Sequence, residues 1–128
     1  MVFGGVFDAF PNLKVILGHL GEGIPFGFHR LLDHTPYVAA NRRLRRLPEQ
    51  VLRENLWVTT SGAFSAPAFR CTLEVLGIDR VMFSVDWPYE SNRVAMKFLS
   101  DLPLSHEDRE KLEWRNAARL LRIEDQFN

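Results

Sequence analysis

Three short apolar runs divide the chain, and segments with helical periodicity separate them. The runs are Leu13–Leu17, Leu56–Thr60 and Val81–Val85, each rich in β-branched or large apolar residues and bounded by turn-forming residues. This pattern predicts three strands joined by helices. Successive parallel strands with helical crossovers are right-handed, so helices should cover the outside of the sheet while the strand ends share one rim. The expected fold class is therefore α/β.

The helices are predicted from apolar spacing and from capping residues. Ser105 with Asp108 resembles a capping box, with Asp in place of the usual Glu. Pro36 is expected to close the second helix. The predicted helical segments are Val2–Phe10, Ile24 to about His34, Pro48–Glu54, a helix that starts near Ser65 and Pro67 and ends at Gly77, and a terminal region from Ser105 through Leu121.

Composition and charge narrow the class of protein but do not indicate a function. The 128 residues are 46% hydrophobic and 25% charged, with 16 basic and 16 acidic residues, which is typical of one soluble globular unit. The basic run Arg42–Arg46 could contact phosphate, but the neutral total favours a solvated segment and no nucleic-acid partner. Cys71 is the single cysteine, so no internal disulfide forms. No basic leader and no membrane-length apolar run occur, and a cytoplasmic location is expected.

Candidate chemistry lies where two of the strands end. His19 and Glu22 follow the first strand, and Asp86 follows the third. Because parallel strands place their carboxyl ends on one rim, His19 and Asp86 should face the same side. The spacing of His19 and Glu22 across a glycine-containing turn allows a hydrogen bond that fixes the imidazole tautomer and favours proton transfer. The alternative is a histidine that pins a loop, with Glu22 at a helix start.

The residues around Asp86 leave its role open. A carboxylate after an apolar strand needs a cation, a donor or water, so Asp86 either ligates a metal or caps the following loop. Trp87 and Tyr89 are placed to wall a pocket. Arg30 suits a substrate carboxylate, but a solvated arginine covering a helix face is the simpler interpretation. Ser61 lacks the Gly-x-Ser-x-Gly elbow, so serine hydrolysis is not predicted.

Four stretches together resemble a known enzyme family. They are Phe10–Glu22 with the core Leu17-Gly18-His19-Leu20-Gly21-Glu22, Asn55–Gly62, Val81–Tyr89 with Ser84-Val85-Asp86-Trp87-Pro88, and Asn116–Leu121. The sequence resembles the amidohydrolase-related metal enzymes, above all the non-oxidative decarboxylases of the aminocarboxymuconate semialdehyde and γ-resorcylate type. In that family such segments form the last part of a (β/α)₈ TIM barrel. A whole barrel needs about 250 residues, so residues 1–128 are expected to be one partial domain, a C-terminal fragment.

The resemblance implies a role for each candidate residue. His19 and Glu22 would be a catalytic pair, Asp86 a ligand of one divalent metal (Zn or Mn), and Arg30 a carboxylate contact in a neighbouring subunit of a homo-oligomer. Trp87 and Tyr89 would lie against the substrate, a small aromatic or unsaturated carboxylic acid.

The same resemblance implies that part of the site lies outside this sequence. The paired His-x-His or Glu-x-His group of the first barrel strand and a histidine of the fifth have no counterpart here, so the isolated chain is expected to be inactive and prone to self-association through open strand edges. Two alternatives stay open: a metal-dependent lactone or amide hydrolase, and a non-catalytic remnant.

Overall fold

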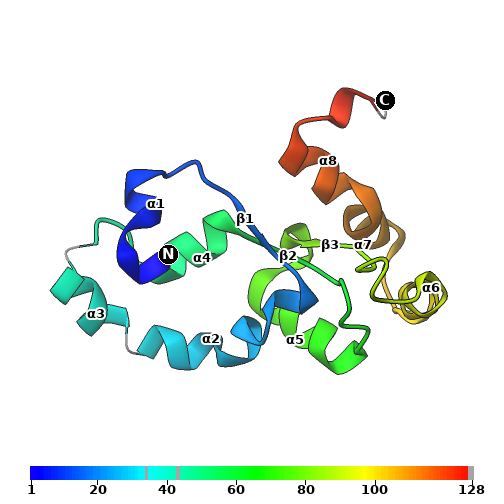
Figure 1. The fold of residues 1–128 in the computed structure, drawn as a ribbon, viewed down its shortest axis with the longest axis horizontal. Helices are drawn as coiled ribbons and strands as arrows, with labels where there is room; N and C mark the ends of the chain where they lie inside the picture. The colour runs from blue at the N-terminus through cyan, green and yellow to red at the C-terminus, as the bar shows by residue number, and fades with distance from the viewer. Residues whose placement is uncertain (34, 43, 127–128) are drawn as a thin grey trace.

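The chain forms one three-stranded parallel sheet with helices around it (Figure 1). The computed structural model describes residues 1–33, 35–42 and 44–126. The strands are β1 (Val15–Leu17), β2 (Leu56–Thr59) and β3 (Val81–Met82), in the order β1-β2-β3. In the register, Ile16 faces Trp57 and Thr59 faces Met82. The predicted α/β class with three parallel strands is confirmed.

All three strands are shorter than the apolar runs that predicted them. Beyond β3, the Phe83 amide donates to the Leu112 carbonyl, 2.8 Å away, instead of extending the strand ladder. Before β1, the Leu13 carbonyl accepts from the side chain of Asn55 at 2.7 Å. The backbone groups at these ends are therefore satisfied by partners outside the sheet, and regular pairing stops there.

The predicted helices are present, and three features differ from expectation. The bounds are α1 (Val6–Ala9), α2 (Ile24–Asp33), α3 (Thr35–Arg42), α4 (Pro48–Asn55), α5 (Ala66–Leu76), α6 (Asn92–Asp101), α7 (His106–Glu110) and α8 (Asn116–Leu121), with 3₁₀ turns at Val2–Gly4, His19–Gly21, Ile78–Arg80 and Glu124–Gln126 and a π-helical turn at Lys111–Arg115. The segment predicted as one helix over Val2–Phe10 is broken at Gly5, which has a φ of 73°.

The other two differences concern Pro36 and α6. Helix α2 ends at Asp33, close to its predicted end, whereas His34 lies outside the described residues. Pro36 does not simply end a helix, because it lies in the first turn of α3, where proline's missing N–H leaves no helical bond unmade. Neither α3, which contains Pro36, nor α6 was predicted. The run Arg42–Arg46 includes Arg43, which lies outside the described residues.

The main core lies between one face of the sheet and helices α5 and α6. Val58 and Val81 are fully buried, and Phe69, Phe98 and Leu112 pack in the same cluster. The opposite face carries Ile16, which is 49% exposed, and Trp57, which is covered by the guanidinium groups of Arg80 and Arg119 at 4.9 and 5.5 Å from its ring. One face of the sheet is thus closed, and the other is partly open at β1.

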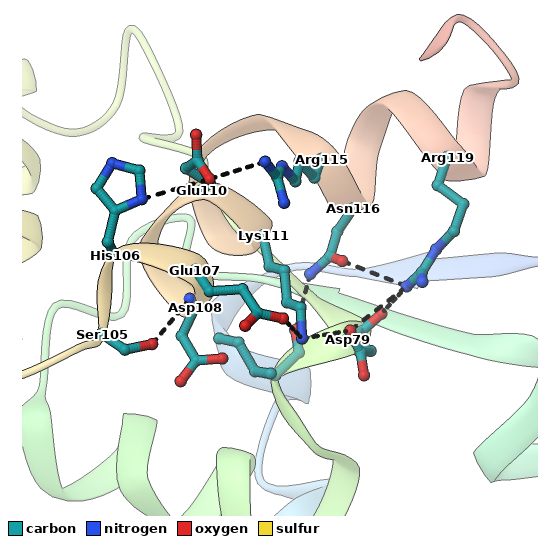
Figure 2. Close-up of polar contacts among 11 residues, drawn as sticks. Asp79, Ser105, His106, Glu107, Asp108, Glu110, Lys111, Arg115, Asn116 and Arg119 are labelled. Carbon is teal, nitrogen blue, oxygen red and sulfur yellow. Dashed lines mark hydrogen bonds and ion pairs between the residues drawn. The ribbon is translucent and has the colours of Figure 1, made fainter.

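Two buried asparagines fix the segments that lead into the edge strands. Asn55 donates to the carbonyls of Pro11 and Leu13 before β1. Asn116 donates to the carbonyls of Ile78 and Val81 at 2.7 and 2.8 Å, at the start of β3. Figure 2 shows Asn116 beside a network of ion pairs that joins the C-terminal helices to the segment before β3.

That network is centred on Asp79. Its carboxylate faces the Lys111 ammonium at 3.5 Å and the Arg119 guanidinium at 3.9 Å, and Lys111 also pairs with Glu107 at 3.1 Å (Figure 2). The pKa of Lys111 is raised, first by its hydrogen bond to Glu107 and then by Asp79. The acidic partners Asp79 and Glu107 are 55% and 69% exposed, so the network orients the C-terminal helices with little net stabilisation per pair. Among the described residues, no helix is long and apolar enough to cross a membrane.

Candidate active site

The turn after β1 has an unusual backbone. His19, Leu20 and Glu22 all have left-handed conformations, with φ values of 48°, 54° and 56°, and Asp86 after β3 has a φ of 78°. Such conformations are costly for residues other than glycine and concentrate at functional sites. The turn is held by its surroundings: Leu20 is 3% exposed, and the His19 amide donates to the Ser61 carbonyl at 3.1 Å.

His19 lies between two carboxylates at the rim formed by the strand ends. Its Nδ1 is 2.5 Å from Oε1 of Glu22, and its Nε2 is 3.3 Å from Oδ2 of Asp86. The three side chains are 47%, 64% and 36% exposed, so the site is open to solvent. The meeting of His19 with Asp86, 67 residues apart in sequence, agrees with the expectation that both face one rim.

This arrangement favours the protonated imidazole. A neutral imidazole can donate from one nitrogen only, whereas the imidazolium donates from both and so satisfies both carboxylates. The pKa of His19 is raised above its ordinary value, first by the hydrogen bond to Glu22 and then by the one to Asp86, against a smaller effect of burial. The two carboxylates therefore favour a proton on His19, which the imidazole can release to a group placed at the open rim.

The residues at the rim fit part of a metal site. The Asp86 carboxylate is a ligand that divalent Zn or Mn accepts, and its side chain is 36% exposed at the rim. Within the described ranges, no group of three or more His, Cys, Asp and Glu side chains could hold a metal ion. A catalytic site normally uses three protein ligands, so Asp86 would need further ligands from other parts of a complete barrel.

A cavity of about 400 Å³ lies beside His19. Residues of the turn, of α2 and of α5 line it, among them Pro25, Phe26, Pro67 and Cys71. Its walls are mainly apolar, and Phe26 at its margin is 90% exposed. A small ring could lie there next to the imidazole.

The side chains of the other predicted residues, Arg30, Trp87 and Tyr89, are exposed. Arg30 lies on an exposed part of α2, two turns beyond the turn that carries His19. Trp87 is 72% exposed and Tyr89 is 86% exposed. These three residues are near the rim in sequence, but their roles toward a substrate stay predictions.

The loop after β2 contains residues whose importance the sequence did not reveal. The hydroxyl of Ser61 is hydrogen-bonded to the hydroxyl of Thr59 at 2.7 Å. Gly62 lies next to the side chains of both His19 and Asp86: a Cβ atom built on it would lie 2.9 Å from Cδ2 of His19 and 3.3 Å from Oδ2 of Asp86. The only sequence signal was a glycine in the loop that follows the middle strand.

Relatives of this chain are decarboxylases. The chain is 40% identical to decarboxylase orsB of Emericella nidulans over 93% of its length, and 36% identical to the gamma-resorcylate decarboxylase of a Polaromonas species over 93%. The crystal structure of a Polaromonas dihydroxybenzoic acid decarboxylase with bound manganese and the inhibitor 2-nitroresorcinol matches 96% of the chain with a TM-score of 0.86 and 34% identity.

The match covers nearly all of this chain but only part of each relative. The chain spans 37% of the length of both curated relatives and 38% of the manganese-containing structure. Such structural neighbours are TIM-barrel enzymes, so the three strands correspond to part of a barrel. The family model described as amidohydrolase matches residues 1–123. The chain therefore belongs to the amidohydrolase family.

Proposed function

We propose that this chain supplies the histidine–carboxylate part of the active site of a metal-dependent decarboxylase that acts on a small aromatic carboxylic acid. The observation that carries the proposal is the single imidazole held between Glu22 and Asp86 at the strand-end rim. The identity to decarboxylases of aromatic acids supports the reaction class.

Each of the three side chains has a distinct task in this proposal. Loss of carbon dioxide leaves the electron pair of the broken carbon–carbon bond on the ring carbon, which must take up a proton. His19 delivers that proton, and Glu22 holds its Nδ1 so that the ring keeps one orientation and regains its charge. Asp86 is the metal ligand of this chain, with His19 beside it. The metal, when bound, would polarise substrate oxygens and fix the substrate's position.

The exposed residues complete the proposal. Arg30 would bind a carboxylate of a substrate in a neighbouring subunit, which requires a homo-oligomer, because its planar guanidinium forms two parallel hydrogen bonds. Trp87 and Tyr89 would cover the substrate ring once the remaining parts of a barrel surround them. The free thiol of Cys71 agrees with our proposal of a cytoplasmic protein.

Completing the barrel tests the function. The chain would be produced alone and as a chimera joined to the N-terminal portion of the Polaromonas gamma-resorcylate decarboxylase that it does not match, each loaded with manganese. We expect carbon dioxide release from dihydroxybenzoates by the chimera and none by the chain alone. Asp86→Asn and His19→Asn should each lower the rate of the chimera by at least about a hundredfold. Asp101→Asn, on the exposed side of α6, is the matched control.

The products separate the alternatives. Carbon dioxide release that depends on Asp86 supports a decarboxylase. A ring-opened product that keeps all carbons would instead identify a hydrolase. A folded, manganese-loaded chimera whose rate is unchanged by Asp86→Asn would overturn the proposal, since its site would then not use this chain's carboxylate.

A further inference from the structure

The three residues directly after strand β2 lie against the segments that carry His19 and Asp86. Thr60, Ser61 and Gly62 lie between the turn after β1 and the loop after β3. None of the three carries a group that the proposed reaction uses. Together, however, they contact both segments: Thr60 bonds to Ser84, Ser61 bonds to His19, and Gly62 lies against both side chains.

Thr60 fixes the segment that leads to Asp86. Its side chain is fully buried, and its hydroxyl donates to the Ser84 carbonyl at 2.8 Å while accepting from the Ser84 amide at 3.0 Å. The threonine side chain thus takes the place of a strand partner beyond the end of β3, two residues before Asp86. A hydroxyl that satisfies both backbone groups of one residue fixes that residue's position.

Ser61 and Gly62 position the backbone and the ring of His19. The Ser61 carbonyl accepts from the His19 amide at 3.1 Å, which fixes the backbone from which the imidazole extends. Gly62 has a φ of 67°, and a Cβ atom there would lie 2.9 Å from the imidazole and 3.3 Å from the Asp86 carboxylate. Real Cβ contacts essentially never reach 2.9 Å, so either the ring or the loop would have to move.

We propose that the segment Thr60–Gly62 positions the reacting pair, with Thr60 fixing the Asp86 loop and Gly62 leaving the space in which the imidazole reaches Asp86. Gly62 is a positioning residue in this sense, since it contributes no functional group. The inference rests on the proposed function only where it calls His19 and Asp86 a reacting pair. The contact between Nε2 and Oδ2 can be tested without any reaction.

The test is nuclear magnetic resonance of the ¹⁵N-histidine-labelled chain with a chelator present and the pH fixed. We expect Gly62→Ala to shift the His19 Nε2 resonance in the same direction as Asp86→Asn does, because both remove the same contact. The double variant should then shift it no further than Asp86→Asn alone. Gly5→Ala is the matched control: Gly5 has a φ of 73°, and a Cβ there meets only Leu44, at 3.8 Å. Gly5→Ala therefore also places an alanine at a positive φ, but it should leave the His19 Nε2 resonance unchanged.

Thr60 provides a second arm if Gly62→Ala does not fold. Thr60→Val keeps the shape of the side chain and removes the hydroxyl, so it should shift the same Nε2 resonance. Thr60→Ser keeps the hydroxyl, so its Nε2 resonance should match that of the wild type. The proposal is overturned if folded Gly62→Ala leaves His19 unchanged, if its effect adds fully to that of Asp86→Asn, or if Thr60→Val matches the wild type. Failure of carbon dioxide release in the chimera would count against the proposed function alone.

Discussion

The two contacts of the His19 imidazole, with Glu22 and with Asp86, depend on different parts of the structure. Glu22 is on the same turn, at 2.5 Å, so the local backbone determines this contact. Asp86 comes from a distant strand end, so the contact at 3.3 Å depends on the whole sheet. A local change in the turn should therefore affect Nδ1 first, and a change in packing between strands should affect Nε2 first.

Removing the Glu22 carboxylate should lower the pKa of His19. Glu22 is the largest cause of the raised value, so Glu22→Gln moves the pKa back toward the ordinary 6.5 in metal-free chain. Since the folded-state pKa lies above the unfolded one, the stabilisation is complete below pH 6.5 and is lost as the pH rises through the folded value. Titration of the imidazole by nuclear magnetic resonance measures this. The exposed Glu74→Gln is the control, and an unchanged pKa in Glu22→Gln would contradict the assignment.

The elements show what the residue pattern could and could not predict. The β-α-β-α-β order and the meeting of His19 with Asp86 followed from apolar runs and from the geometry of parallel sheets. Helix α6 escaped prediction, although its apolar face buries Ala95, Phe98 and Leu99. The role of Gly62 was not predicted because it depends on the absence of a side chain where the loop meets His19 and Asp86. Hydrophobic periodicity carries no information about such tertiary contacts.

Strand ends also depended on tertiary partners. The predicted strand to Val85 stops at Met82 because Phe83 bonds to the π-helical turn and Ser84 to a threonine side chain. An apolar run reports burial, but burial does not specify which group satisfies the backbone. For this reason the two asparagines that fix the strand entrances were not recognised as structural residues.

Asn116→Leu should destabilise the chain by about 2 kcal/mol. The substitution keeps the volume but leaves the carbonyls of Ile78 and Val81 without the amide that they share, in a position that is 1% exposed. It also removes the acceptor for Arg119 seen in Figure 2. Denaturant unfolding measures the loss.

The matched control for this asparagine is Asn92→Leu at the exposed start of α6, which should change the free energy of unfolding by less than about 0.5 kcal/mol. Equal effects of the two substitutions would show that the Asn116 bonds contribute nothing specific.

On the scale of the whole molecule, the sheet has two edges and one partly open face. In Figure 1 the helices α1–α4 gather on the β1 side and α6–α8 on the β3 side, with the sheet between them. Strand β1 pairs only with β2 among the described residues, and so does β3. A barrel removes such edges by closure, whereas an open parallel edge invites pairing with another chain.

The isolated chain should therefore self-associate through β1, and Ile16 should be a main contributor. Its side chain is 49% exposed on the open face of the edge strand, so association would bury apolar surface there. Ile16→Lys places a charge on that edge, a device by which natural sheets prevent pairing, and should shift sedimentation toward the monomer at micromolar concentration. Met96→Lys changes a residue on α6 that is 54% exposed and should leave association unchanged. If the wild type associates and both variants sediment like it, association uses another surface. If the wild type is already monomeric, the open edge of β1 does not mediate association, and the sheet is stable without further strands.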